Sequence, residues 1–154
     1  MGLGAAAVPG NIAGLCTAHR REGRLPLERV IEPAIRLAQS GVEVTPAMEV
    51  ILAVIGPIFL RDPVLARAVS RSGEFLKAGD TMHYSHVLPV LEAVARGGEE
   101  SFYRGDIAAS IVQHCEANGG LITRNDLAGY TPSISRPVRR SVRGHQLLLN
   151  GPPS

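Results

Sequence analysis

The 154-residue sequence has no tryptophan, and aromatic residues of all kinds make up only 4% of it. This scarcity disfavours an aromatic-cored β-sandwich and favours helices that pack through Ala, Val, Ile and Leu. Charged residues are also few, at 19%, and the net charge is only +2. These values indicate neither a disordered chain nor a nucleic-acid-binding protein. A hydrophobic content of 45% is instead typical of a globular chain.

Cysteine is almost absent as well. Cys16 and Cys115 are too few and too far apart to form a disulfide framework, and we expect both to be small buried hydrophobic residues. The most apolar stretch, residues 47–60, is shorter than the ~20 residues of a membrane span, and Gly56-Pro57 is expected to break it. The first residues lack the basic start of a signal peptide, so none is expected.

Apolar periodicity predicts roughly six helices before residue 130. Their expected boundaries are Gly23, Pro26, Gly41, Thr45-Pro46, Asp62-Pro63, Gly97-Gly98, Asp106, Asn118 and a capping box from Thr123 to Asp126. Pro33 lies inside one helical pattern and predicts a kink or two short helices. Asp106 is expected to cap its helix, and Phe102 and Tyr103 are expected on a short turn.

Two segments indicate an incomplete domain. The helix expected over residues 47–55 is apolar on nearly every side, which is typical of a helix buried all round. Residues 138–149, with a break at Gly144, read as a β-hairpin, and a lone hairpin is marginally stable without a partner sheet. The predicted fold is therefore mainly α with a C-terminal β-hairpin. We expect residues 1–154 to form one incomplete domain: a helical layer (1–130), then the hairpin and a truncated loop (131–154).

Cofactor and metal motifs are weak. Gly2-Leu3-Gly4 and the adjoining alanines fit a loose dinucleotide pattern, but no strand precedes them and Val8-Pro9-Gly10 interrupts the segment where a helix is needed. His83 and His86 form a pair, and His114 adjoins Cys115, but no further ligands complete a zinc set. We therefore expect no cofactor and no structural metal.

Catalytic and nucleic-acid motifs are equally sparse. No Gly-x-Ser-x-Gly elbow occurs, and the adjacent pair Glu99-Glu100 is expected at a solvated helix start. A basic run near the end of the chain comprises Arg136, Arg139, Arg140, Arg143 and His145. Because stacking aromatics are missing, we interpret this run as the arginine-bearing outer face of the hairpin, solvated or facing a protein partner, rather than a nucleic-acid site.

Short motifs succeed one another in a distinctive order. They are Ala7-Val8-Pro9-Gly10, Gly14-Leu15, Ala18-His19, Gly23-x-Leu25-Pro26, Pro33-Ala34-Ile35-x-Leu37-Ala38, Gly41-Val42-x-Val44, Gly79-Asp80-Thr81, Phe102-Tyr103-x-Gly105-x-Ile107-Ala108, Gly120-Leu121-Ile122-Thr123, Asp126-Leu127-Ala128-x-Tyr130 and Pro152-Pro153-Ser154. Together they resemble the gamma-glutamyltranspeptidase family over nearly the whole chain, most weakly between residues 48 and 72. No single motif is specific, but their collinear order is.

The resemblance implies a proenzyme with an αββα N-terminal-nucleophile fold that cleaves itself into a large and a small subunit. In such enzymes the freed threonine of the small subunit attacks the gamma-glutamyl amide of glutathione and similar donors. The glutamyl group then passes to water or to an amino acid. The hydroxyl is activated by its own α-amine, and backbone donors stabilise the oxyanion. Members are often periplasmic, secreted or at the cell surface.

The sequence departs from the family pattern at the reacting groups. A Thr-Thr-His-like processing site is absent, and so is the donor-gripping arginine expected upstream of the Val-Pro-Gly segment. Threonines occur only in other contexts, at Thr17, Thr45, Thr81, Thr123 and Thr131. We therefore assign no catalytic, cofactor or metal residue, and expect an internal piece of the large subunit that is inactive alone. Its expected partners are the remaining large-subunit and small-subunit segments.

Two alternatives remain. Relatives with the same large-subunit layout include cephalosporin acylases and a capsule-attaching transpeptidase. The chain could instead be a stand-alone helical interaction module without catalysis. Such a module would need a polar outer surface on the helix at residues 47–55, and the sequence shows the opposite.

Overall fold

The computed structural model describes residues 3–151 and is mainly helical. The helices are η1 (Leu3–Ala5), α1 (Asn11–Glu22), α2 (Leu27–Ser40), α3 (Pro46–Phe59), α4 (Pro63–Val69), η2 (Ser85–Val87), α5 (Leu88–Tyr103), α6 (Asp106–Ala117) and α7 (Arg124–Gly129). The strands are β1 (Val42–Glu43), β2 (Ser70–Arg71), β3 (Glu74–Phe75), β4 (Thr81–Met82), β5 (Val138–Val142) and β6 (His145–Leu149). The mainly helical composition and the C-terminal hairpin agree with the sequence prediction.

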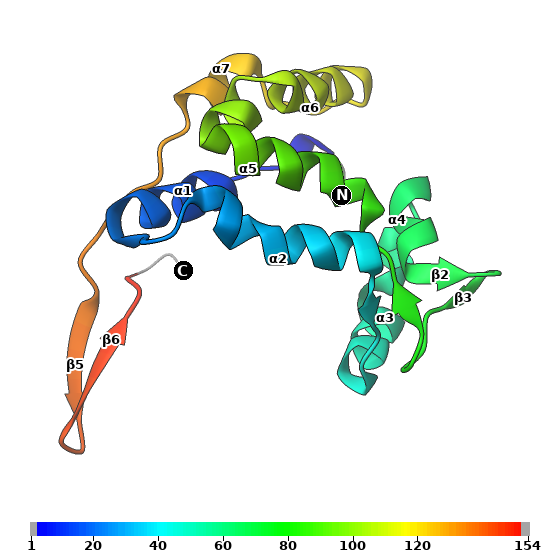
Figure 1. Ribbon diagram of the computed structural model, residues 1–154, viewed down its shortest axis with the longest axis horizontal. Helices are drawn as coiled ribbons and strands as arrows, with labels where there is room; N and C mark the ends of the chain where they lie inside the picture. The colour runs from blue at the N-terminus through cyan, green and yellow to red at the C-terminus, as the bar shows by residue number, and fades with distance from the viewer. Residues whose placement is uncertain (1–2, 152–154) are drawn as a thin grey trace.

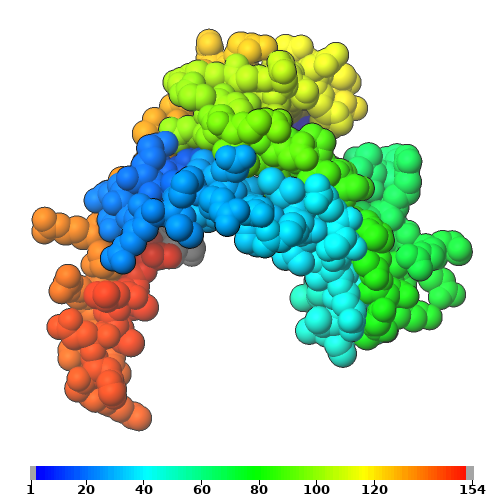
Figure 2. Space-filling view, viewed as in Figure 1, coloured from blue at the N-terminus to red at the C-terminus, as the bar shows by residue number. Residues whose placement is uncertain are grey.

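The molecule has the shape of an arch (Figures 1 and 2). α2 runs along its span, beneath a layer formed by α5, α6 and α7. The β5–β6 hairpin descends from one end of the span, and α3 and the β2–β3 pair descend from the other, where α4 lies beside the end of the span. No helix within residues 3–151 is long and apolar enough to cross a membrane.

Two separate hydrophobic cores hold the arch together. The larger core lies under the helical layer and contains Ala13, Cys16, Val94, Phe102, Tyr103, Ala108, Cys115, Ile122 and Leu127. The smaller core contains Val44, Leu52, Val69, Leu76 and Met82. Both cysteines are free and buried in the larger core, as the sequence predicted.

Two prolines lie inside continuous helices, so the expected break at Gly56-Pro57 and the alternative of two short helices at Pro33 are both wrong. α2 runs continuously through Pro33, and α3 runs through Gly56 and Pro57 to its end at Phe59. A proline within a helix removes one N–H···O=C bond, and packing on either side can offset that loss. Gly56 does not end the helix. It allows the Phe75 ring to pack closely against α3, because a Cβ at this position would lie 2.5 Å from that ring.

The surface of α3 is strongly apolar. Its Thr45 cap was predicted correctly, since the Thr45 hydroxyl oxygen accepts a hydrogen bond from the Met48 N–H. The helix is not buried all round within this chain, because only Leu52 and Gly56 are buried. The exposed aliphatic side chains of this segment are Val50, Ile51, Val54, Ile55, Ile58 and Leu60.

α5 is bent at Gly98, whose φ of 59° and ψ of −148° are non-helical. The break lies at the predicted Gly97-Gly98 stop, but the chain then resumes a helix rather than the expected short turn. Phe102 and Tyr103 lie on that second half and are buried. Both aromatic rings belong to the larger core, and this burial stabilises a helical segment where the sequence showed only a brief apolar pair.

Helix caps were predicted to within a residue. The capping box at the start of α7 is present: the Asp126 N–H donates to the Thr123 hydroxyl, and the Thr123 N–H donates to the Asp126 carboxylate. α6 begins one residue differently, because its N-cap is Gly105 and Asp106 occupies the first helical position. The two-residue antiparallel pairs β1–β4 and β2–β3 were not predicted, since they are too short to show alternation.

The predicted hairpin forms with Val138 opposite Leu149 and Val142 opposite His145. Its two-residue turn has positive φ at Arg143 (49°) and Gly144 (80°), the pattern of a type I′ turn. The register corrects the expected arginine face. Arg140 pairs with Leu147 on the same face as the two valines, because side chains alternate along a strand, so the arginines divide between both faces.

Candidate functional site

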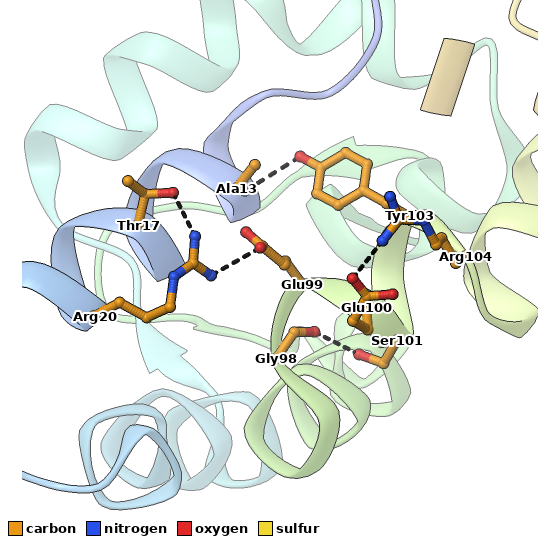
Figure 3. Close-up of polar contacts among 9 residues, drawn as sticks. All are labelled: Ala13, Thr17, Arg20, Gly98, Glu99, Glu100, Ser101, Tyr103 and Arg104. Atoms are coloured by element: carbon orange, nitrogen blue, oxygen red, sulfur yellow. Dashed lines mark hydrogen bonds and ion pairs between the residues drawn. The ribbon is translucent and has the colours of Figure 1, made fainter. Parts of the chain in front are cut away.

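A polar cleft of about 310 Å³ lies between α1, the second half of α5 and the segment that leads toward the hairpin. Its lining residues are Ala13, Thr17, Arg20, Glu99, Glu100, Tyr103, Arg104, Ala128, Tyr130, Thr131, Pro132 and Ile134. Figure 3 shows its polar contacts among α1, the Gly98 bend and the end of α5. It is the candidate functional site because it gathers charged side chains from segments far apart in the sequence.

Tyr103 fixes the entry to α1. Its O–H donates to the carbonyl oxygen of Pro9 at 2.5 Å, and its oxygen accepts the N–H of Ala13 at 3.2 Å. Tyr103 is only 5% exposed, so these bonds satisfy polar groups that would be costly to leave unpaired. One phenol thereby holds two backbone positions on either side of the helix start.

Tyr130, the residue that follows α7, packs against Tyr103. Its ring stacks on Tyr103 with centroids 5.8 Å apart and planes inclined by 11°. A Cβ on Gly10 would lie 2.2 Å from the Tyr130 hydroxyl oxygen, so glycine is required at this position. The Pro9-Gly10 segment and the exit from α7 are therefore packed directly against each other.

Arg20 joins α1 to α5. Its guanidinium lies 2.7 Å from the Glu99 carboxylate and also donates to the Thr17 hydroxyl oxygen at 2.9 Å. Glu99 is available for this ion pair because Gly98 interrupts the helix immediately before it. The Glu99 side chain is 29% exposed, so it is not the fully solvated carboxylate that the sequence suggested.

Glu100 pairs with Arg104 one helical turn later on α5. The Arg104 guanidinium also donates to the carbonyl oxygen of Ala128 at 3.1 Å and so connects α5 to α7. The adjacent Glu99 and Glu100 thus form ion pairs with different arginines. Each cation that lines the cleft is matched by a carboxylate within the described chain.

Two groups of this region, the Cys16 thiol and the Tyr103 phenol, are not activated for nucleophilic attack. Burial raises the pKa of the Cys16 thiol, and the nearby Glu99 carboxylate raises this pKa further. Burial likewise raises the pKa of Tyr103. A thiol or phenol with a raised pKa is protonated near neutral pH and is a poor nucleophile. The hydrogen bonds and ion pairs of the cleft therefore position backbone segments.

The other candidate groups do not assemble into a site. No cluster of three or more metal-ligating side chains occurs in the part of the chain that the structure describes, and His83, His86 and His114 remain outside such a set. Leu3–Ala5 forms a short 3₁₀ turn rather than the strand-to-helix turn of a dinucleotide site. Met1, Gly2 and the motif Pro152-Pro153-Ser154 lie outside the described residues.

The role of Tyr103 and the Arg20–Glu99 pair were not found from the sequence. Their partners lie about 80 to 95 residues away, and no local pattern encodes such a contact. The sequence placed Phe102 and Tyr103 on a short turn and in the family pattern, and neither feature indicates these contacts. The buried position of the tyrosine gives this motif a physical explanation.

Comparisons with known proteins agree with one another. The family model for gamma-glutamyltranspeptidase matches residues 1–154. The chain is 37% identical over 151 residues to a glutathione hydrolase proenzyme of Escherichia coli strain K12, covering 97% of this chain and 26% of that protein. It is 36% identical to the Acylase ACY 1 proenzyme of Pseudomonas sp. strain V22, covering all of this chain and 28% of that protein.

Solved structures show the same relation. The crystal structure of Helicobacter pylori gamma-glutamyltranspeptidase matches with a TM-score of 0.90 and 30% identity, over 99% of this chain and 44% of that chain. The chain spans about a quarter of the length of the curated relatives above. The order of motifs, the fold and these matches agree: the chain belongs to the gamma-glutamyltranspeptidase family.

Proposed function

We propose that this chain is a structural part of a gamma-glutamyltransferase or glutathione hydrolase. The observations that carry the proposal are the match of residues 1–154 to the family model and the match of 97% of the chain to about a quarter of a glutathione hydrolase proenzyme. The complete enzyme would cleave gamma-glutamyl amides and transfer the glutamyl group to water or to an amino acid. The partners of this chain would be the remaining segments of the large and small subunits.

The proposed fold of the complete enzyme is the αββα N-terminal-nucleophile fold. Residues 1–130 would form part of its helical layer, and residues 131–154 would lead back toward its sheet. The exposed aliphatic side chains of α3 support the placement of the chain in a larger fold, because several of them together would be unusual on the surface of an independent domain. The hairpin supports it too, since a two-stranded sheet gains stability from further strands.

The chain alone is proposed to be inactive. Its polar cleft contains paired charges and a tyrosine committed to two backbone bonds, with no threonine set against a free α-amine. Residual catalysis in enzymes that lack a nucleophile depends on an intact binding site and oxyanion hole. We assign neither to this chain, so its contribution would be to position the segments before α1 and after α7.

An acylase is the second candidate function. The chain is 36% identical to the Acylase ACY 1 proenzyme in an alignment that covers all of its residues, and its identity to the glutathione hydrolase proenzyme is nearly the same at 37%. A stand-alone interaction module is the third, and the exposed aliphatic side chains of Val50, Ile51 and Val54 disfavour it.

The test compares the chain with the complete coding sequence that contains it. The complete protein should release a chromogenic amine from a gamma-glutamyl anilide, in proportion to protein and above a boiled control. The purified chain should release none. Hydrolysis of an aliphatic acyl anilide but not of the gamma-glutamyl anilide would favour the acylase. Turnover by the chain alone would contradict the proposed structural role.

A further inference from the structure

The β5–β6 hairpin stands apart from the rest of the structure (Figure 1). Within residues 3–151, no hydrogen bond or ion pair joins the segment 131–151 to the helices. Every residue of β6 is exposed, including Leu147, Leu148 and Leu149. Such a run of leucines on a free strand is an edge that another strand can join.

The turn determines which backbone groups face outward. In a hairpin closed by a two-residue turn, the flanking residues, here Val142 and His145, exchange hydrogen bonds with each other. Bonding then alternates along both strands. The N–H and C=O groups of Arg139 and Ser141 therefore face away from β6, and those of Gln146 and Leu148 face away from β5.

The two outer edges differ in their ability to accept a strand. Pro137 lies two residues before Arg139, so its backbone nitrogen also faces away from β6, and proline has no N–H to donate there. β5 itself carries two arginines. Proline and long charged side chains are the features that protect an edge from pairing. β6 contains neither proline nor a Lys or Arg residue. The β6 edge is therefore the open one.

The charge of the hairpin indicates the chemistry of the joining strand. Residues 131–151 contain four arginines and no Asp or Glu, whereas the whole chain has a net charge of only +2, so the rest of the chain is net negative. On one face, Arg140 lies among Val138, Val142, Leu147 and Leu149. An arginine covered together with aliphatic neighbours needs a carboxylate partner, because an unpaired buried charge is strongly destabilising.

We propose that the outer edge of β6 is the docking edge of the hairpin, and that it accepts a β-strand bearing aliphatic side chains and a carboxylate that reaches Arg140. This inference rests on the proposed function, in which that strand belongs to enzyme segments beyond the matched quarter. β5 then forms the outer, protected edge of the joined sheet on this side. The carboxylate fixes the register, since a slip of one residue would place it on the opposite face.

The experiment measures amide hydrogen exchange of the chain with a soluble strand peptide of alternating Val and Glu. The peptide should slow exchange at the Gln146 and Leu148 amides by about tenfold or more and leave those of Arg139 and Ser141 unchanged. A peptide of alternating Val and Lys, with the same length, should have no effect. Arg140→Glu should abolish the response to the acidic peptide and create one to the basic peptide.

Matched proline variants test the choice of edge. Leu148→Pro removes an outward N–H from β6 and should abolish the protection, whereas Ser141→Pro removes the equivalent N–H from β5 and should leave it intact. Circular dichroism checks that both variants retain their helices. If Leu148→Pro disrupts the hairpin itself, loss of protection at Val142 and Leu147 will reveal it, and Leu148→Lys then provides the test.

Several outcomes would overturn the inference. They are protection at Arg139 and Ser141 instead, equal responses to both peptides, and no response to either peptide. Protection of the Gln146 and Leu148 amides that rises with chain concentration in the absence of peptide would identify a second copy as the occupant of this edge and would also overturn it. None of these results bears on amine release by the complete protein, so the edge assignment can fail while the proposed function stands.

Discussion

At the scale of single residues, Tyr103 connects the second half of α5 to the start of α1 through two hydrogen bonds. Its hydroxyl serves the Pro9 carbonyl and the Ala13 N–H at once, from a position 90 or more residues along the chain. Arg20 and Glu99 form a second contact between the same regions, but at 55% and 29% side-chain exposure. Exposed ion pairs contribute little to stability, so the tyrosine is expected to be the stronger of the two connections.

Tyr103→Phe should lower the free energy of unfolding by about 1–3 kcal/mol, because it leaves two backbone groups without a partner. Urea denaturation measures the loss, and faster amide exchange at Ala13 localises it. Tyr84→Phe is the matched control, since the Tyr84 hydroxyl forms no hydrogen bond within residues 3–151. Equal losses in the two variants would show that the Tyr103 bonds contribute nothing specific.

The capping box of α7 predicts a pH dependence. Hydrogen bonds from the hydroxyl and backbone N–H of Thr123 hold the pKa of Asp126 below its ordinary value of 3.8. A carboxylate with a depressed folded-state pKa stabilises the fold above its unfolded-state pKa, and this contribution is lost as the pH falls through the folded-state value. The stability difference between wild type and Asp126→Asn should therefore be largest near neutral pH and shrink below pH 3.8.

Chemical denaturation at a series of pH values measures this difference. Asp106→Asn provides a control, because the Asp106 carboxylate lies in a first helical turn without forming a cap hydrogen bond within residues 3–151. A difference between wild type and Asp126→Asn that stays constant from neutral to acidic pH would contradict the assignment.

At the scale of elements, helices with strong end signals were predicted well. Thr45-Pro46, Asp62-Pro63 and the Thr123 capping box mark the starts of α3, α4 and α7, because these signals act through backbone groups only a few residues away. The helices continue through Pro33 and Pro57, because packing can offset the loss of one hydrogen bond and no local sequence pattern reveals that packing. The polar cleft escaped prediction for a related reason, since its contacts join α1 to the distant α5.

The bend of α5 gives a prediction at this scale. Gly98→Ala should lower the free energy of unfolding by about 1–3 kcal/mol, because a φ of 59° with a ψ of −148° is available essentially only to glycine. Space is not the cause, since the nearest atom to an added Cβ would be Leu27 Cδ2 at 4.0 Å. Thermal or urea unfolding measures the loss.

Gly14→Ala is the matched control for this substitution. Gly14 is helical and has no atom within 4 Å of an added Cβ, so alanine there should raise stability by about 0.5–1 kcal/mol. A Gly98→Ala protein as stable as wild type would show that the backbone of α5 straightens without cost. In that case Glu99 would not depend on the bend to reach Arg20.

At the scale of the whole molecule, two small cores and an exposed apolar helix predict a loosely packed isolated chain. Each aliphatic side chain left exposed on α3 forgoes roughly 1.5–3 kcal/mol relative to full burial. Several together rival the ~5–15 kcal/mol that holds a domain folded. We expect the isolated chain to be helical, to bind a hydrophobic dye and to self-associate as its concentration rises.

Dye fluorescence and sedimentation measure both properties. The double variant Val50→Ser and Val54→Ser should weaken dye binding and association. Leu15→Ser, at a side chain that is 67% exposed on α1, should change them less. Adding the missing enzyme segments should suppress both. A monodisperse monomer with a sharp cooperative melt and no dye binding would favour the stand-alone module instead.

The larger core also has a consequence for biosynthesis. It unites Ala13 and Cys16 of α1 with Ile122 and Leu127. A ribosome makes the chain from its N-terminus at ~5–20 residues per second, so α1 waits on the order of ten seconds before the last of these partners has been translated. During this interval α1 lacks the last of the core partners that this chain supplies. Nascent-chain factors that bind apolar segments would therefore meet α1 before this core is complete.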